Sequence, residues 1–114
     1  MFIRIVGINT DNQQPHVHSL KYFKWQLVDG GFAGNVLDTR LSSKHSMLHL
    51  VDNADNHVFV NHDNSVFPVR KKEDFIHTQP HGGFDDALLK LEHFPVSEQM
   101  KFKLKFATRD GLRA

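Results

Sequence analysis

Histidine offers the widest range of site chemistry in this chain, and nine of the 114 residues are histidine. His16 and His18 are two positions apart, so on a β-strand both imidazoles project from one face, about 7 Å from each other. Two such imidazoles can bind one metal ion, and Zn²⁺ is the cofactor we would expect there. His45 and His49 form a second candidate pair, because residues four apart share a face of a helix. The spacing of these two pairs indicates no third metal ligand. The simpler explanation is that the histidines lie on the surface and bind no cofactor.

Lysine forms a second pattern near the C-terminus. Lys101, Lys103 and Lys105 alternate with Phe102, Leu104 and Phe106. This alternation predicts a β-strand that turns its lysines outward and its apolar residues toward the core. Three ammonium groups about 7 Å apart along such a strand could follow a phosphate backbone. The simpler alternative is the ordinary solvent-facing half of an amphipathic strand, where lysine also protects a sheet edge.

Two further basic groups could add to such a surface. Tyr22 and Lys24 belong to a run of alternating basic and aromatic residues that could stack a base and neutralise a phosphate. Arg70 and Lys71 form the other group. The net charge of +1 is low for a dedicated nucleic-acid-binding protein, so the partner could equally be a protein.

Signatures of catalysis are missing from the sequence. The chain contains no cysteine, no Gly-x-Ser-x-Gly motif and no phosphate-binding loop with its lysine. The aspartates and asparagines between residues 52 and 64 lack the order of a calcium-binding loop and suit turns better. We therefore lean toward a protein that is not an enzyme.

The candidate residues depend on a small number of expected elements. Residues 2–8 predict a first strand, 16–28 a second strand or a bent pair, and 36–43 a third. In the second, alternation directs Phe23, Trp25 and Leu27 toward the core. Residues 43–51 favour a short helix that the Ser42-Ser43 pair could cap, with a strand as the alternative.

The clearest local signal is a β-hairpin with arms at 56–60 and 64–69, joined by a four-residue loop at 61–64. Pro68 places the second arm at a sheet edge or at a bulge, because proline donates no backbone hydrogen bond. A short strand follows at 73–78. Asp85 or Asp86 can then cap a helix that extends to about His93.

The elements together indicate an α+β, β-rich fold: a small, mostly antiparallel sheet or open barrel with one or two short helices packed on it. We expect one compact domain over residues 1–107 and a flexible basic C-terminal tail over 108–114. Five Lys and Arg against one Asp give residues 101–114 a net charge of +4, whereas residues 1–100 carry −3.

The leading hypothesis is a non-enzymatic binding or regulatory module that contacts protein or nucleic acid through its basic strand face. A protein partner, or a second copy of the chain, is expected, and a scaffold within a larger complex is equally compatible. The alternative is a histidine-dependent metal-binding protein or a small metal-dependent hydrolase. No apolar run is long enough to span a membrane, and the first residues lack the layout of a signal peptide, so we expect no membrane contact and a cytoplasmic location.

Overall fold

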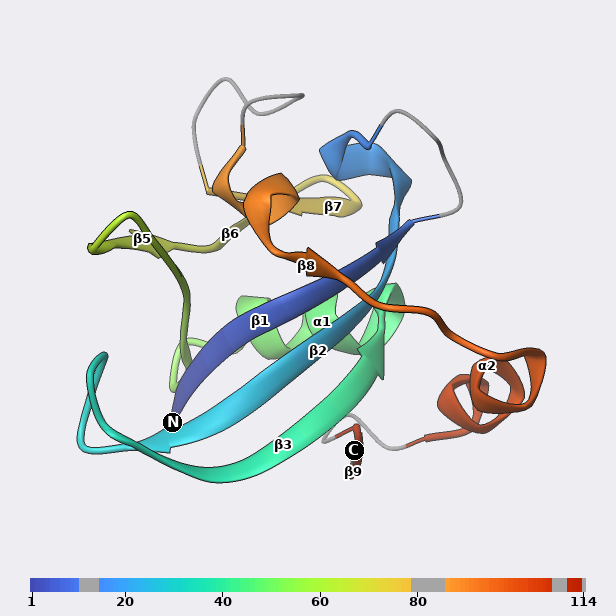
Figure 1. The fold of residues 1–114 in the computed structure, drawn as a ribbon, viewed down its shortest axis with the longest axis horizontal. Helices are drawn as coiled ribbons and strands as arrows, with labels where there is room; N and C mark the ends of the chain where they lie inside the picture. The colour runs from blue at the N-terminus through green and yellow to red at the C-terminus, as the bar shows by residue number, and fades with distance from the viewer. Residues whose placement is uncertain (11–14, 79–85, 108–110, 114) are drawn as a thin grey trace.

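The computed structural model describes residues 1–10, 15–78, 86–107 and 111–113, and one seven-stranded sheet dominates this part of the chain (Figure 1). The strand order is β5-β4-β1-β2-β3-β9, and β8 pairs with β1. The strands are β1 (Phe2–Thr10), β2 (Leu20–Asp29), β3 (Asn35–Ser43), β4 (His57–His62), β5 (Ser65–Pro68), β8 (Glu92–His93) and β9 (Leu112–Arg113). Most pairings are antiparallel, and only β4 and β8 run parallel to β1 among the described strands. The expected β-rich α+β fold is therefore confirmed, in its open-sheet form.

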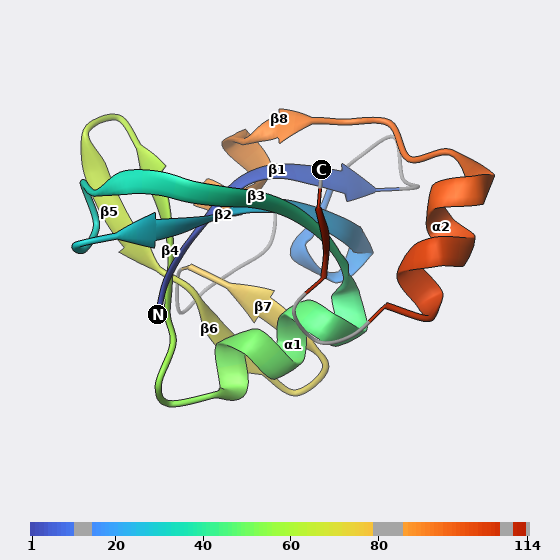
Figure 2. The ribbon, with the colours of Figure 1, turned by 90° about the horizontal axis from the view of Figure 1, so that it is seen from below.

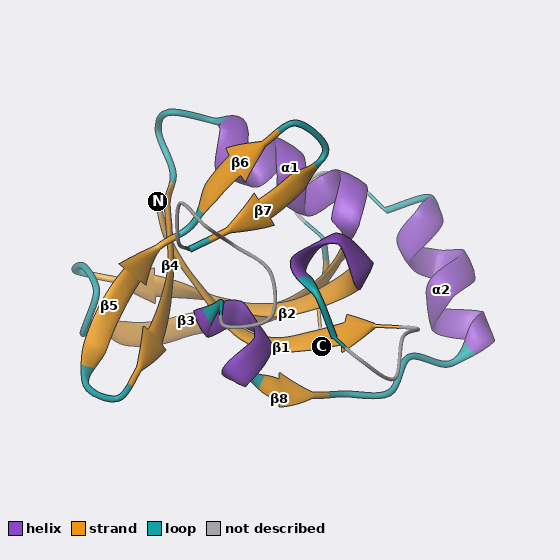
Figure 3. Cartoon of the chain, turned by 90° about the horizontal axis from the view of Figure 1, so that it is seen from above, coloured by secondary structure: helices purple, strands orange, loops and turns teal. Residues whose placement is uncertain are grey.

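A second layer covers one face of the sheet. It consists of the helix α1 (Lys44–Asp52) and a two-stranded ribbon of β6 (Arg70–Lys72) and β7 (Phe75–His77). Figures 2 and 3 show this layer on one side of β1, β2 and β3, whereas α2 (Glu98–Lys105) stands at one end of the sheet. Two 3-10 helices, η1 (Val17–Ser19) and η3 (Ala87–Lys90), complete the described elements. No helix in the described ranges is long and apolar enough to cross a membrane.

The core forms between the sheet and α1. Phe23 and Trp25 of β2 are each 1% exposed, which confirms the expected inward face of this strand, and Leu27 packs partly buried against the same core. From α1, Met47 is fully buried. Burial of each large apolar side chain contributes about 1.5–3 kcal/mol. The Trp25 indole N–H donates to the Ser42 hydroxyl at 2.7 Å, so its one polar group is satisfied inside the core.

Helix α1 and the hairpin follow the sequence prediction, with one difference in the turn. Ser43 caps α1 by accepting the Ser46 N–H, which confirms the helix expected there. The hairpin is formed by β4 and β5, and Pro68 lies on the edge strand as expected. The predicted four-residue loop is wrong: Asp63 and Asn64 alone form the turn, both with positive φ, because these two residue types tolerate the left-handed region.

The segment after β7 is less helical than expected. Asp86 caps η3 by accepting the Leu88 N–H, but this 3-10 helix ends at Lys90. The chain then extends so that Glu92 and His93 pair with β1, and the helix predicted to reach His93 is therefore wrong. Asp85, the other candidate cap, lies outside the described residues.

The strand predicted for residues 101–106 is also wrong, because these residues belong to α2 and its C-terminal cap. Ser97 accepts the Met100 N–H as the N-cap, and Glu98 lies in the first turn, where a negative charge suits the helix dipole. Leu104 is 1% exposed, but Phe102 is 67% and Phe106 is 70% exposed. The apolar residues therefore do not share the single face that a strand would have given them.

The expected C-terminal tail contains a strand. Leu112 and Arg113 form β9 and pair with Arg40 and Leu41 of β3. Residues 108–110 and 114 of the same segment lie outside the described part of the chain.

Candidate binding groove beside α2

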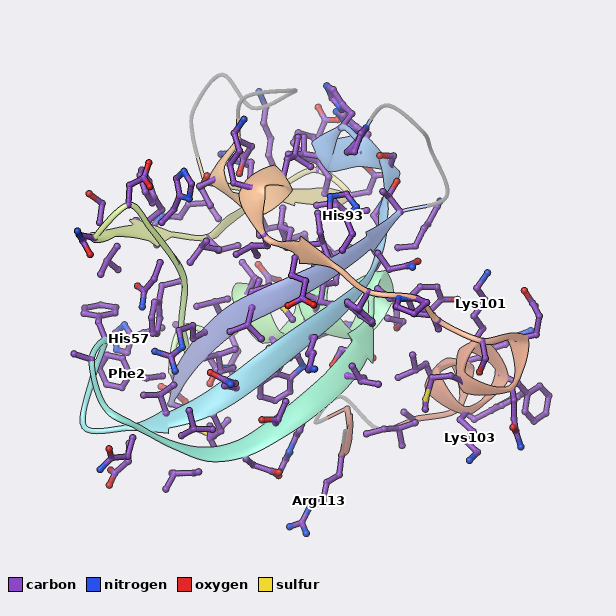
Figure 4. The ribbon with its side chains drawn as sticks, in the orientation of Figure 1. Phe2, His57, His93, Lys101, Lys103 and Arg113 are labelled. Carbon is purple, nitrogen blue, oxygen red and sulfur yellow. The ribbon has the colours of Figure 1, made fainter. Side chains whose placement is uncertain are left out.

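The position of α2 separates its three lysines. Met100 and Leu104 lie one turn apart and form the side of the helix that packs on the body, with Leu104 almost fully buried. Lys101 and Lys105 follow next around the helix and are also one turn apart. Lys103 lies on the other flank, and Figure 4 shows Lys101 and Lys103 projecting in different directions from α2. The basic strand face of the sequence hypothesis therefore does not exist, and two of its three lysines form a pair instead.

Lys101 and Lys105 line a groove of about 590 Å³ between α2 and the body. The body contributes the end of the sheet at which β3 leads into α1 (Figure 2). The residues that line the groove are Tyr22, Ser43, His45, Ser46, Glu98, Lys101, Phe102, Lys105 and Ala107.

The charges in this groove are unevenly balanced. The Lys101 ammonium lies 3.3 Å from the carboxylate of Glu98 in a solvent-exposed ion pair, which contributes little to stability. Lys105 has no carboxylate within 4.0 Å in the described part of the chain, and its ammonium lies 5.9 Å from the centre of the Phe106 ring. The N-terminus of α1, at Ser43, adds the positive end of a helix dipole. The groove is therefore suited to a negatively charged group.

Aromatic rings border the same space. Tyr22 is half-buried on the sheet face opposite the core, and Phe102 is largely exposed. The Phe102 and Phe106 rings meet edge to face with their centres 5.1 Å apart. A ligand in this groove would meet flat apolar surfaces as well as ammonium groups.

The other predicted basic residues lie elsewhere. Lys24 is two positions from Tyr22 on β2 and lines a separate cleft of about 270 Å³ with Glu92 and Phe94. Arg70 and Lys71 belong to the ribbon behind the sheet, where the Lys71 ammonium lies 3.7 Å from an Asp52 carboxylate oxygen. Of the seven predicted contact residues, the groove brings together Tyr22, Lys101 and Lys105.

The first predicted metal pair is close in space, but not on a strand. His16 caps η1 and His18 lies within it, and their rings stack with centres 5.0 Å apart. The Nδ1 atom of His16 accepts the backbone N–H of His18 at 3.2 Å, so this nitrogen serves as a structural acceptor. The centre of the His18 ring also lies 4.0 Å from the centre of the Phe75 ring on β7.

The second pair lies on a helix, as its spacing required. The rings of His45 and His49 meet edge to face on α1 with their centres 4.7 Å apart. Within residues 1–10, 15–78, 86–107 and 111–113, no group of three or more His, Asp or Glu residues could hold a metal ion. Neither histidine pair therefore has the third protein ligand of a zinc site in these ranges.

The sequence reasoning missed His45, Phe102 and the Ser43 cap as parts of one groove. The available signal was the pattern of Pro95 followed by Ser97 and Glu98, which is typical of a helix start. A helix at that position puts Lys101 and Lys105 on one side, but their approach to Tyr22 depends on tertiary packing.

No known family model matches the chain, and neither the curated proteins nor the solved structures contain a significant match.

Proposed function

We propose that this protein is a non-enzymatic binding module that holds a short single-stranded nucleic acid in the groove beside α2. One observation carries the proposal: Lys101 and Lys105 line the same groove as Tyr22 and Phe102. Single-stranded nucleic acids are bound by this combination of cations for phosphates and aromatic faces for bases.

The geometry of the groove supports contacts to neighbouring phosphates. Residues one helical turn apart have Cβ atoms about 5–6 Å from each other, so Lys101 and Lys105 can reach adjacent phosphates of one strand. Each base that stacks on an aromatic side chain contributes about 1–3 kcal/mol to binding. Two phosphates and one or two bases would fill the site, which is in keeping with the low net charge of the chain.

The two serine hydroxyl groups in the groove have structural roles, which favours binding over catalysis by a serine nucleophile. The Ser43 hydroxyl accepts the Ser46 N–H at 3.3 Å, and the two serine hydroxyls lie 3.4 Å apart. These contacts cap the N-terminus of α1.

The proposal is tested by titrating a fluorescent oligothymidylate of about eight nucleotides at several salt concentrations, followed by anisotropy. Two phosphate contacts predict a slope of about −1.4 in the logarithm of the binding constant against the logarithm of salt concentration. Lys101→Gln and Lys105→Gln should each reduce the magnitude of that slope by about 0.7.

Lys103→Gln is the matched control, because it removes the same charge from the same helix outside the groove. It should leave the slope unchanged. A slope near zero, or an equal loss in all three variants, would reject the proposed phosphate contacts. Tighter binding of a polyglutamate peptide than of the oligonucleotide would replace the nucleic acid by an acidic protein partner.

A further inference from the structure

A second cleft lies at the other end of the sheet from α2. It measures about 490 Å³ and separates the loop between β2 and β3 from the tip of the β4–β5 hairpin. Both borders project on the left side of Figure 1, away from α2 on the right. Arg4, Phe32 and Ala33 line one part of the cleft, and hairpin residues 61–66 line the rest.

Arg4 is held in an unusual way. It belongs to β1 in the middle of the sheet and is half-buried there. Its Nε and Nη2 atoms donate to the Gln26 side-chain oxygen at 3.1 and 2.8 Å. No carboxylate lies within 4.0 Å of Arg4 in the described part of the chain. Because an arginine side chain has five N–H donors, the two bonds to Gln26 leave three for other acceptors.

The neutral partner is the informative feature. Arginine inside a protein usually pairs with a carboxylate, which forms two parallel hydrogen bonds and balances its charge. Glutamate at position 26 could make the same contacts to Arg4 with a full negative charge. Gln26 fixes the guanidinium group but leaves its positive charge uncompensated, and the side chain borders a cleft.

We propose that this cleft binds a small organic carboxylate through Arg4, with the apolar part of the ligand against Phe32. The Phe32 side chain is 45% exposed, and its ring is held edge to face by Phe2 and Phe59, with ring centres 5.3 and 4.9 Å away. It therefore offers a fixed apolar wall beside the cation.

The charges around the cleft favour a single negative charge on the ligand. One guanidinium group balances one carboxylate. Asp63 lines the same cleft, with a carboxylate oxygen 3.2 Å from His62 Nε2, and its negative charge would oppose a second negative charge on the ligand. A doubly charged phosphate ester is disfavoured for this reason. The site is independent of the groove proposed for nucleic acid and can exist without it.

The test is a titration with sodium benzoate, followed by NMR at the Arg4 Nε–H resonance, with neutral benzamide in parallel. Benzoate should give saturable shifts in the wild-type protein, and benzamide should bind at least tenfold more weakly. Gln26→Glu should weaken benzoate binding at least tenfold and raise the melting temperature, because it supplies the missing carboxylate inside the chain. Arg70→Gln removes a positive charge from β6, outside the lining of the cleft, and should change neither property.

Benzoate binding that survives Gln26→Glu, or equal binding of benzamide, would show that the Arg4 charge does not hold the ligand. Tighter binding of phenyl phosphate than of benzoate would overturn the assignment of a carboxylate. Gln26→Glu keeps the size of the side chain, so we expect the variant to fold. The same NMR spectra verify this.

Discussion

Asp38 shows how single residues set the charge of the sheet surface. The side-chain hydrogen bond from Arg40, 2.9 Å from Asp38 Oδ2, holds the pKa of Asp38 below its usual value of 3.8. Partial burial opposes this effect, whereas the charges of Arg113 and Arg40 and the Thr39 N–H lower the pKa further. Arg113 belongs to β9, so the last described strand is joined to β3 by this charge as well as by its backbone.

The lowered pKa predicts a pH dependence of stability with a defined sign. The folded state favours the ionised carboxylate, so Asp38 stabilises the fold fully above its unfolded pKa of 3.8 and loses this effect as pH falls through the lower folded value. Asp38→Asn should therefore lower the free energy of unfolding near pH 7, and its difference from the wild type should shrink as the pH falls below 3.8. Chemical denaturation across this range measures the effect. A difference that stays constant down to the lowest pH would contradict it.

At the scale of elements, α2 decides whether the candidate groove exists. The run from Lys101 to Phe106 alternates perfectly, yet six residues can satisfy a strand period without forming a strand. Lysine, leucine, glutamine and methionine all favour helices, and Ser97 supplies the cap. The alternation of residues 101–106 therefore predicted a strand wrongly. Ser97, a residue type that caps helices, was the better indication that a helix begins here.

Ser97→Ala tests this helix directly. Loss of an N-cap costs about 1 kcal/mol, which should raise amide hydrogen exchange within α2 about fivefold. Exchange in β1 and β2 should not change, because α2 is a peripheral element beside the sheet. Ser65→Ala, at an exposed strand position, is the control. Unchanged exchange at Lys101–Lys105 would argue against the capped helix.

Elements with strong local signals could be predicted from the sequence, and those that depend on distant partners could not. The first three strands, α1 and the hairpin carry their own alternation, caps or turn residues. By contrast, β8 and β9 are two residues long, and each forms only because a preceding strand offers an edge. The approach of Tyr22 to Lys101 is likewise a result of packing between segments about 80 residues apart in the chain.

At the scale of the whole molecule, the two candidate sites lie at opposite ends of one sheet. Strand β2 connects them, with Tyr22 in the α2 groove and Gln26 bonded to Arg4 at the other cleft. Tyr22, Arg4 and Gln26 alternate with the buried core residues of their strands, so substitutions at these three positions need not disturb the core. The net charge of −3 over residues 1–100 would disfavour contact between a polyanion and most of the body.

A backbone amide NMR spectrum recorded during titration with unlabelled oligothymidylate tests the central claim most directly, because it locates the contact on the whole molecule. We predict saturable shifts at Tyr22, His45, Lys101 and Lys105, and none at the basic strand β6 (Arg70–Lys72) behind the sheet. Shifts concentrated on β6, or an unchanged spectrum at low salt, would contradict the proposal that the groove beside α2 is the binding site.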